Sequence, residues 1–397
     1  MSTDGDARPA VRVAHLTTVD SSLRFLLFPQ LAAIVDAGGE AIGISAPGPW
    51  VGGLERDGVR HVALVSSTRG MNLLADLRAA RDLWHILRRL RVDVLHTHNP
   101  KPGLYGRAVG RLAGVPIVVN TVHGYYASDT DRLLKRTVVY FLEAVASRFS
   151  DAELFQNPED LAVARRWRIA RPTRSLLLGN GIDLVRFDPS RFSAEQRAEV
   201  RASLGVRPDQ VLVGTVGRLV AEKGYRELFT AAAALDARFS VLVIGPADAE
   251  KADELSAAEM QRAKDDGVQF LGMRDDVDEL YAAMDVFTLP SHREGFPRAA
   301  MEAAAMGLPI VATDIRGCRQ VVAHEVNGLL VPPRDAGALG AAIQRLGRDP
   351  ALRKRMGAAS RERAREQFDE QSVVRTVLQT YRGIARRRDL DLGPLTD

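Results

Sequence analysis

The sequence has little that could cross-link the chain or span a membrane. Cys318 is the single cysteine among 397 residues, so no intramolecular disulfide can form and a reducing compartment is expected. No stretch of 18 apolar residues occurs, so no transmembrane helix is predicted. Residues 1–9 are polar and acidic, unlike a secretory signal peptide. We therefore expect a cytoplasmic protein with a disordered tail at 1–9. Any membrane association would be peripheral, on the inner face of the membrane.

Net charge is also small, with 54 Lys and Arg against 50 Asp and Glu. The basic surplus is concentrated between Arg78 and Arg111, where eight basic residues accompany only Asp82 and Asp93. Such a segment can contact phosphates, an anionic membrane or nucleic acid, or it can be a solvated helix face. Aromatic residues make up only 6% of the chain, and no stacking cluster or nucleic-acid motif accompanies the charge. No nucleic-acid partner is predicted.

Short apolar runs alternate with helical patterns along the whole chain, which is typical of parallel sheets built from strand-helix-strand units. The length suits two domains. We predict an α/β protein with two doubly wound, Rossmann-like lobes facing each other across a cleft. The predicted strands are 11–17, 40–46, 59–65, 92–98, 116–122, 151–156 and 175–178 in the first lobe, and 211–216, 240–244, 268–271, 286–289, 310–312 and 328–331 in the second. Helices are predicted at 23–36, 71–89, 103–112, 131–149 and 158–167.

Turn-forming residues at 179–183 (GNGID) suit a hinge between the lobes. The last helical pattern, from 369 onward, is long enough to reach back to the first lobe. The predicted domains are an N-terminal acceptor-binding lobe at 10–182, a linker with its own helix at 183–209, a donor-binding lobe at 210–368 and a C-terminal helix at 369–397 that crosses back.

One short segment, 291–298 (SHREGFPR), combines a carboxylate with free backbone donors after a buried strand. We expect the next helix to begin at Pro297, because proline has no N–H to satisfy at the first helical position. Glu294 would accept hydrogen bonds from ligand hydroxyls while the Gly295 and Phe296 amides donate at the helix start.

A second acid, Glu302, lies eight positions after Glu294 among alanines. Small apolar neighbours imply close packing, where a carboxylate is costly unless a partner satisfies it. A ribose diol or an internal arginine would do so equally well.

A loop after the first strand of the second lobe carries two cations, Arg218 and Lys223, and ends in a helix. Both cations and the helix amides can converge on a diphosphate, and Gly217 allows close approach of the backbone. Solvated surface cations are the alternative.

Taken in order, these motifs resemble those of the retaining nucleotide-sugar glycosyltransferases of family 4, which have the two-lobed GT-B architecture. The resemblance covers most of the chain. The motifs that carry it are HTH at 96–98, TVHG at 121–124, GNGID at 179–183, GR and KG at 217–218 and 223–224, GMRDDV at 272–277, the segment 285–291, the two glutamates and GLPIVAT at 307–313.

The resemblance implies a role for each motif residue and a nucleoside-diphosphate sugar as the donor. Uridine is the base expected from the resemblance, and guanosine is the alternative. No metal or cofactor is then required, since preorganised cations can stabilise the departing phosphate. Glu294 is expected to position the sugar and not to act as a nucleophile, because paired-carboxylate chemistry needs two acids about 5–9 Å apart on one bond. The implied roles are diphosphate binding for Arg218 and Lys223, ribose binding for Glu302, sugar binding for Glu294, Gly295 and Phe296, base contacts for Met273 and Arg274, close backbone approach for Gly217, and a place at the reaction centre for His123.

The acceptor side departs from the family pattern. The loop at 17–22 (TTVDSS) has no glycine pair, so hydroxyls would have to substitute. Pro297 replaces a frequent glycine, and Arg298 follows it, which suggests a donor with an N-acetyl or acidic sugar. The acceptor-binding candidates are Thr18, Ser22, Arg24, His98 and Tyr125. We expect His96 and His98 to point to opposite faces of their strand, so that they form no metal pair.

The acceptor class remains open between several readings. The helical pattern at 131–149 has an apolar side and basic residues, which can lie on an anionic bilayer, although a core-facing helix is the more common use of this pattern. A lipid-diphosphate-linked glycan precursor is the leading acceptor. The alternatives are a soluble transferase acting on a small metabolite, a nucleotide-sugar 2-epimerase of the same architecture, and a silent binding subunit, which the presence of both cations and both acids disfavours.

Overall fold

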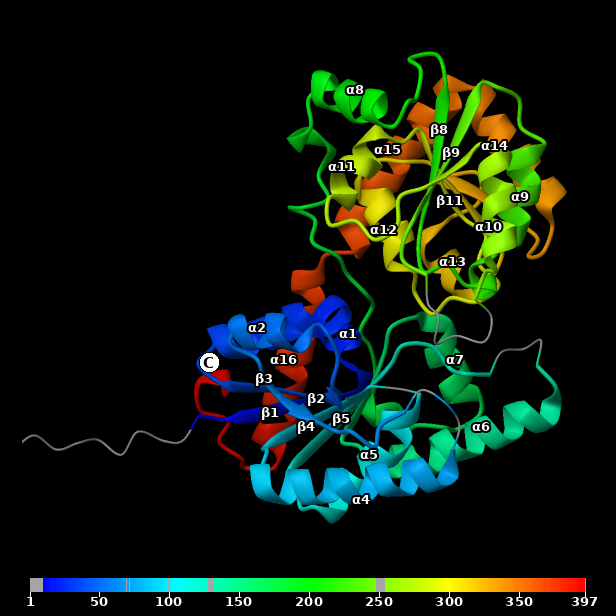
Figure 1. The fold of residues 1–397 in the computed structure, drawn as a ribbon. Helices are drawn as coiled ribbons and strands as arrows, with labels where there is room; N and C mark the ends of the chain where they lie inside the picture. The colour runs from blue at the N-terminus through cyan, green and yellow to red at the C-terminus, as the bar shows by residue number, and fades with distance from the viewer. Residues whose placement is uncertain are drawn as a thin grey trace, which may run out of the picture. The chain divides into compact units, whose positions relative to one another are not determined.

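The computed structural model describes residues 10–68, 70, 72–98, 100–127, 131–247 and 254–396, so the predicted tail at 1–9 lies outside the described residues. The chain divides into two compact units. Unit 1 is Met1–Gly179 together with Gln371–Asp397, and unit 2 is Asn180–Glu370. Each unit is built on a parallel sheet with helices on both faces (Figure 1). The prediction of two doubly wound α/β lobes is confirmed.

The unit 1 sheet has seven parallel strands in the order β3-β2-β1-β4-β5-β6-β7. Each of them coincides with a predicted strand to within about two residues, because strands buried on both faces form near-continuous apolar runs. The strands are β1 Arg12–Val19, β2 Glu40–Ala46, β3 Arg60–Ala63, β4 Val94–His98, β5 Ile117–Val122, β6 Ala152–Phe155 and β7 Ser175–Leu177.

Helices cover both faces of this sheet. Figure 1 shows α4 below the strands and α2 above them, and two buried clusters line the opposite faces, one with residues of α4 and α5 and the other with residues of α2 and α16. The helices of unit 1 are α1 Asp20–Ser22, η1 Leu23–Leu27, α2 Phe28–Asp36, α3 Val51–Arg56, α4 Leu73–Leu90, α5 Lys101–Leu112, α6 Leu133–Ala146, η2 Ser147–Phe149, α7 Pro158–Arg166, η3 Pro172–Arg174, α16 Glu370–Arg387 and η6 Gly393–Thr396.

The predicted glycine-free loop at 17–22 is not a loop. β1 continues to Val19, and α1 begins at the next residue. Asp20 is buried, and its carboxylate accepts hydrogen bonds from the Ser21 and Trp50 amides at 2.8 Å each. An acid therefore ties this strand end to the turn that follows β2.

Part of the basic surplus between Arg78 and Arg111 is structural. Arg107 is 1% exposed and forms ion pairs with Glu153 at 2.8 Å and Glu143 at 2.5 Å. Lys101 is also buried and pairs with Asp76 at 2.5 Å. These residues hold α5 in place, so they do not add to a basic surface.

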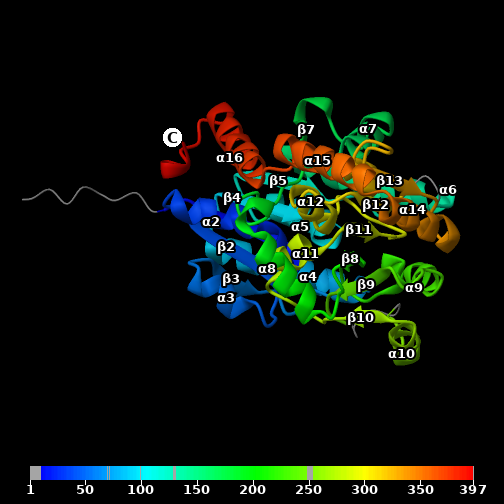
Figure 2. The same ribbon diagram turned by 90° about the horizontal axis from the view of Figure 1, so that it is seen from above.

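Unit 2 has six parallel strands in the order β10-β9-β8-β11-β12-β13, which Figure 2 shows side by side. The strands are β8 Val211–Val216, β9 Phe239–Ile244, β10 Val268–Phe270, β11 Val286–Leu289, β12 Ile310–Thr313 and β13 Gly328–Val331. The helices are η4 Pro189–Arg191, α8 Ala194–Ser203, η5 Ala221–Lys223, α9 Tyr225–Ala233, α10 Ala257–Asp265, α11 Val277–Ala283, α12 Arg298–Ala305, α13 Arg316–Val321, α14 Ala336–Arg348 and α15 Pro350–Gln367.

Within unit 2 the two segments that connect it to unit 1 lie side by side. Ile182 forms a parallel bridge with Asp369, the Ile182 amide donates to the Phe368 carbonyl at 2.9 Å, and the Glu370 amide donates to the Ile182 carbonyl at 3.2 Å. A Cβ at Gly181 would lie 2.4 Å from the Glu370 Cα. Gly181, the second glycine of the 179–183 motif, is therefore required, because the backbone at Glu370 passes directly against it.

No helix in the described part of the chain is long and apolar enough to cross a bilayer.

Candidate active site

The centre of the site in unit 2 is an ion pair between two predicted residues. Lys223, at the end of η5, places its Nζ 2.6 Å from Oε1 of Glu294, in the turn after β11. The Ser291 hydroxyl donates to the same oxygen at 2.8 Å. The Glu294 side chain is only 10% exposed. Among the described residues nothing hydrogen-bonds its other oxygen, Oε2, so this oxygen remains available to accept from a ligand.

Two close backbone approaches and one side-chain hydrogen bond hold this turn in position. Gly224 has φ +72°, and a Cβ there would lie 2.0 Å from the Pro290 carbonyl oxygen. A Cβ at Gly317, in α13, would lie 2.4 Å from the Glu294 carbonyl oxygen. The Thr313 hydroxyl donates to the Ser291 carbonyl at 2.5 Å. The ends of β11 and β12 are thereby joined around Glu294.

Glu302 lies in α12 with its side chain 15% exposed. The Tyr281 hydroxyl shares its proton between the Glu302 Oε2 at 3.2 Å and the Ala299 carbonyl at 3.1 Å, and the Arg298 Nε is 3.9 Å from the Glu302 Oε1. Burial raises the pKa of Glu302, while the charge of Arg298 and the bond from Tyr281 act in the opposite direction. Glu302 therefore has an internal arginine beside it, which is one of the two partners expected from the sequence, the other being a ribose diol. Arg298 does not satisfy the whole Glu302 carboxylate, because no described residue donates a hydrogen bond to Oε1.

Pro297 is not the first helical residue, contrary to the sequence expectation. It is the N-cap of α12, with φ −73° and ψ 110°. Arg298 takes the first helical position, and its guanidinium donates to the Gly181 carbonyl at 3.1 Å. The Asn180 amide donates to the Phe296 carbonyl at 3.2 Å. Two residues of the hinge motif therefore contact the turn that carries Glu294.

The loop after β8 is braced by a tyrosine and a second glycine. The Tyr225 hydroxyl, which is buried, donates to the Gly217 carbonyl at 2.8 Å. A Cβ at Gly245 (φ +144°) would lie 2.0 Å from the same carbonyl oxygen, whereas a Cβ at Gly217 would only touch Tyr225 at 3.4 Å. Glycine is thus needed at 245 for packing. Burial raises the pKa of the Tyr225 phenol; the charge of Glu294 adds to this rise, and the charge of Arg218, which lies in this loop, opposes it.

The predicted base contacts lie after β10. Met273 is 47% exposed. Arg274 forms an ion pair with Asp276, with its Nε 2.7 Å from Oδ1. The Gly272 carbonyl accepts from the Gly245 amide at 2.8 Å, which joins this loop to the loop after β9.

The candidate residues of unit 1 lie in different environments. His123 follows β5, and its Nε2 is 2.9 Å from Nδ1 of the buried His98. Tyr125 is 2% exposed in a cluster with Tyr140 and Phe155, so its ring belongs to the core.

The remaining acceptor candidates are Thr18, Ser22 and Arg24. Thr18 is near the end of β1, and its carbonyl accepts from the Ser67 hydroxyl at 3.2 Å. Ser22 ends α1. Arg24 pairs with Asp57 at 2.5 Å and lies over the Phe28 ring.

The expectation that His96 and His98 point to opposite faces is wrong. Residues two apart on a strand share a face, and the two rings stack with centroids 4.5 Å apart. His15 of β1 joins them, with centroids 4.8 Å from His96 and 5.2 Å from His98.

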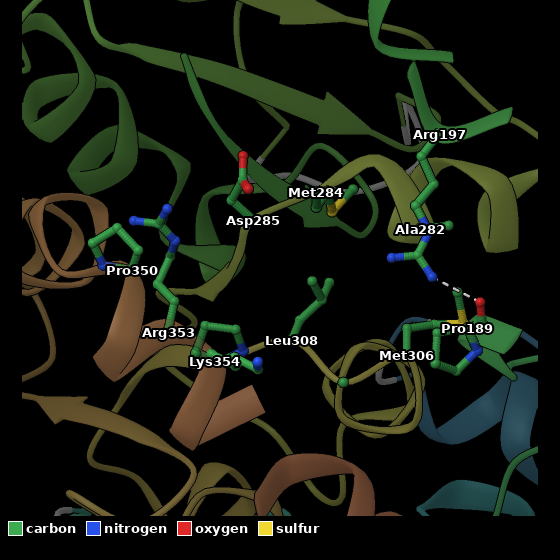
Figure 3. A pocket seen from close by; sticks show the side chains of 12 residues that line it. Pro189, Arg197, Ala282, Met284, Asp285, Met306, Leu308, Pro350, Arg353 and Lys354 are labelled. Carbon is green, nitrogen blue, oxygen red and sulfur yellow. Dashed lines mark hydrogen bonds between the residues drawn. The ribbon is translucent and has the colours of Figure 1, made fainter. Parts of the chain in front are cut away.

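An open pocket in unit 2 lies at the other edge of the sheet (Figure 3). Its lining includes Asp285, directly before β11, and Pro309, directly before β12, together with Arg197 and Arg353. Ligands of open parallel sheets bind beyond the carboxyl ends of the strands. This pocket is therefore not the candidate site, which follows β8, β10 and β11.

Comparison with known proteins decides the family. Residues 11–181 match the "Glycosyl transferase 4-like domain" and residues 196–363 match "Glycosyl transferases group 1". The chain is 31% identical, over 75% of its length and 77% of the relative, to the UDP-Gal:alpha-D-GlcNAc-diphosphoundecaprenol alpha-1,3-galactosyltransferase of Escherichia coli. The chain belongs to the group 1, family 4 glycosyltransferases. It is a hexosyltransferase, and the resemblance inferred from the motifs is confirmed.

Other relatives of this glycosyltransferase differ in their acceptors. This chain is 31% identical to the D-inositol 3-phosphate glycosyltransferase of Saccharomonospora viridis, over 73% of this chain and 70% of that protein. Among solved structures, the sucrose-phosphate synthase of Thermosynechococcus elongatus has a TM-score of 0.80 at 23% identity, covering 95% of this chain and 100% of its own. HepE of Anabaena, in complex with UDP and glucose, has a TM-score of 0.78 at 20% identity, covering 93% and 99%. These two structures show the GT-B fold.

Several residues of the site in this glycosyltransferase were not predicted from the sequence. Tyr225 and Tyr281 were missed because an isolated tyrosine in a helix is normally a core residue. Ser291 had a signal, since it lies three positions before Glu294 in the same turn. The contacts of Asn180 and Arg298 with distant backbone carbonyls have no local sequence signal.

Proposed function

We propose that this glycosyltransferase moves a sugar from a nucleoside-diphosphate donor, with uridine as the base, to a hydroxyl of a lipid-linked glycan precursor at an anionic membrane surface, with retention of configuration and without a metal. Two half-satisfied carboxylates in unit 2 carry the donor half of the proposal. Glu294 and Glu302 are each mostly buried, and each has one oxygen to which no described residue donates. Neither open oxygen is among the buried side-chain atoms of the described residues that lack a partner, so both can be reached from solvent and can accept hydrogen bonds from sugar hydroxyls.

The cations fit the leaving group. Lys223 has three donors and one described hydrogen bond, to Glu294, so two N–H groups can turn to a diphosphate. Negative charge grows on the diphosphate as the glycosidic bond breaks, and a preorganised cation at that point lowers the barrier. Arg218, in the loop after β8, is the second cation proposed for the diphosphate, and its charge acts on the same phenol of Tyr225 as that of Glu294. Glu294 would hold the sugar next to Lys223, while Glu302 holds the ribose.

The donor assignment is tested by thermal stabilisation with a panel of UDP- and GDP-sugars. A ligand at 100 times its dissociation constant adds about 2.7 kcal/mol, which corresponds to about 5–10 °C for a unit of this size. We expect a UDP-sugar to give this shift, and Glu302→Gln or Lys223→Met to remove it. Glu325→Gln, which changes an exposed acid paired with Arg345 in the same unit, should keep it. Stabilisation that survives both site substitutions would refute the donor site.

The membrane half of the proposal rests on α6. Its buried residues are Tyr140, Glu143 and Ala146. On the opposite side of the helix a row of large apolar side chains at spacing i, i+4, i+7 and i+11 faces solvent, contrary to the expectation of a core-facing helix. These side chains are Leu134, Val138, Phe141 and Val145, which are 77%, 49%, 65% and 46% exposed, and Leu133 and Leu142 flank them at 66% and 46%.

Soluble monomeric proteins rarely expose a contiguous apolar row of this kind. Basic residues accompany it, since Arg132, Lys135 and Arg148 are exposed at or beside α6. An apolar row with flanking cations matches an interfacial helix on an anionic bilayer. An enzyme anchored in this way would meet acceptors whose lipid is in the same bilayer.

Vesicle co-sedimentation tests the anchor. We expect binding to vesicles of anionic phospholipid that weakens with salt, and loss of binding in Phe141→Glu with Leu134→Glu. Val185→Glu is the control, because Val185 is 81% exposed but lies in unit 2. Equal binding by all three proteins, or none by the native protein, would contradict the membrane assignment.

A small-metabolite acceptor is the second candidate, because two relatives are named for an inositol phosphate acceptor. Transfer assays that compare a polyprenyl-diphosphate-linked sugar with inositol phosphate separate the two. Product formed from the donor alone would instead indicate a 2-epimerase.

A further inference from the structure

Four histidines and a tyrosine of unit 1 form one continuous hydrogen-bonded chain. His123 Nε2 is 2.9 Å from His98 Nδ1, and His98 Nε2 is 3.1 Å from His15 Nδ1. The Tyr381 hydroxyl is 3.3 Å from His15 Nε2 and 2.6 Å from His96 Nδ1.

At its inner end the chain reaches Thr121, whose hydroxyl is 2.7 Å from His96 Nε2. The side chains come from β1, β4, β5 and α16, elements that are up to 366 residues apart in sequence. All members except His123 are buried.

All hydrogen bonds along this chain must be donated in the same direction. Burial lowers the pKa of His15 to about 3 and holds the pKa of His96 and of His98 well below the usual value, so these three rings are neutral at pH 7. A neutral imidazole has one N–H and one acceptor nitrogen, and each of the three uses both nitrogens. Tyr381 must donate to one neighbour and accept from the other, because a buried hydroxyl proton without an acceptor costs about 1–3 kcal/mol.

The inner end of the chain selects the direction. Thr121 is 1% exposed, and among the described residues His96 Nε2 is the only hydrogen-bond partner of its hydroxyl, so the hydroxyl donates to that nitrogen. The order of donation then runs from Thr121 through His96, Tyr381, His15 and His98 to Nε2 of His123. Burial lowers the pKa of His123 to about 4, against the opposing effect of a hydrogen bond with Gln156, so this ring is also neutral at pH 7 and carries its proton on Nδ1.

We propose that Tyr381, on the C-terminal helix, is a positioning residue that acts through this chain to hold His123 as its Nδ1–H tautomer. His15, His96 and His98 carry their protons on Nδ1 for the same reason. His123 thus presents a fixed hydrogen-bond donor, Nδ1–H, at the end of β5, where a sugar hydroxyl can accept from it. The inference rests on the proposed place of His123 at the reaction centre.

Histidine tautomers are read directly by ¹H–¹⁵N long-range correlation spectra of ¹⁵N-histidine-labelled protein, which contains eight histidines. We expect His15, His96, His98 and His123 to be Nδ1–H in the native enzyme. Nε2–H forms at these four positions would overturn the proposal, as would stoichiometric zinc on His15, His96 and His98, whose ligand atoms lie within 4.8 Å of one another. This measurement needs no variant and stands even if a substitution prevents folding.

Tyr381→Phe removes one hydroxyl and interrupts the chain. We expect His123 to become a tautomer mixture and kcat to fall roughly tenfold, while the KM for the donor stays within about twofold. Thr380→Val is the matched control, since the adjacent Thr380 hydroxyl bonds only within α16, to the Thr376 carbonyl at 2.8 Å. It should change neither the His123 tautomer nor kcat.

A double variant separates failure of this inference from failure of the proposed function. If Tyr381 acts through His123, Tyr381→Phe adds no further loss to His123→Ala, because the two residues act as a unit. An unchanged kcat in His123→Ala would refute the place of His123 in the reaction. A low kcat in His123→Ala with a native kcat and native tautomer in Tyr381→Phe would refute only the role of Tyr381.

Discussion

Acid should destabilise unit 1 well above the pH range in which carboxylates titrate. His15, His96 and His98 are 0%, 0% and 3% exposed, and their pKa values are lowered by burial, that of His15 to about 3. In the unfolded chain each would titrate near 6.5. Below that pH the unfolded state binds protons that the folded state does not bind. The free energy of unfolding therefore decreases as pH falls from 6.5 toward the folded pKa values.

The magnitude follows from linkage. Between pH 7.5 and 5.5 each fully neutral buried histidine lowers the free energy of unfolding by about 1.4 kcal/mol, and three lower it by about 4 kcal/mol. This is a large part of the roughly 5–15 kcal/mol that stabilises a domain. Glu143 offsets some of the loss, because burial raises its pKa and the folded state takes up its proton first as pH falls.

Urea unfolding followed by tryptophan fluorescence measures this effect in the intact chain, because Trp50, Trp84 and Trp167 are all in unit 1. Substitution His15→Asn should reduce the change between pH 7.5 and 5.5 by about 1.4 kcal/mol, whatever it does to stability at pH 7.5. A free energy of unfolding that is flat across this range would show that the histidines are not buried as neutral groups.

Three further outcomes follow from unit 2. Gly224→Ala should lower its free energy of unfolding by more than about 3 kcal/mol, because the new Cβ would meet a carbonyl oxygen at 2.0 Å, whereas Gly205→Ala, with φ +68° and open space, should cost about 1 kcal/mol in the same calorimetric scan. Tyr281→Phe removes the hydrogen bond to Glu302, so titration calorimetry should show about tenfold weaker nucleotide binding; equal affinity would contradict the ribose role. Lys223→Met should reduce kcat by about 10²–10³, and a change confined to KM would instead indicate uniform binding of donor and transition state.

Local sequence patterns determined the fold of this glycosyltransferase and which residues are candidates for its donor site. The thirteen predicted strands are all present, because buried parallel strands are recorded in the chain as short apolar runs. Lys223 and Glu294 were expected to cooperate because each follows a strand of one parallel sheet, and carboxyl ends of such strands meet at one edge. The 2.6 Å ion pair between them was not predicted, because only side-chain packing brings the Lys223 Nζ to the Glu294 carboxylate.

Tertiary structure alone decided which side chains complete these sites. Tyr381 meets His96 across 285 residues, and Arg298 reaches the Gly181 carbonyl across 117; no periodicity encodes contacts that depend on how helices pack onto a sheet. The same holds for α6, whose apolar pattern is compatible with burial or exposure. A helix pattern shows that one side is apolar, but only the packing of the neighbouring elements determines which side faces water.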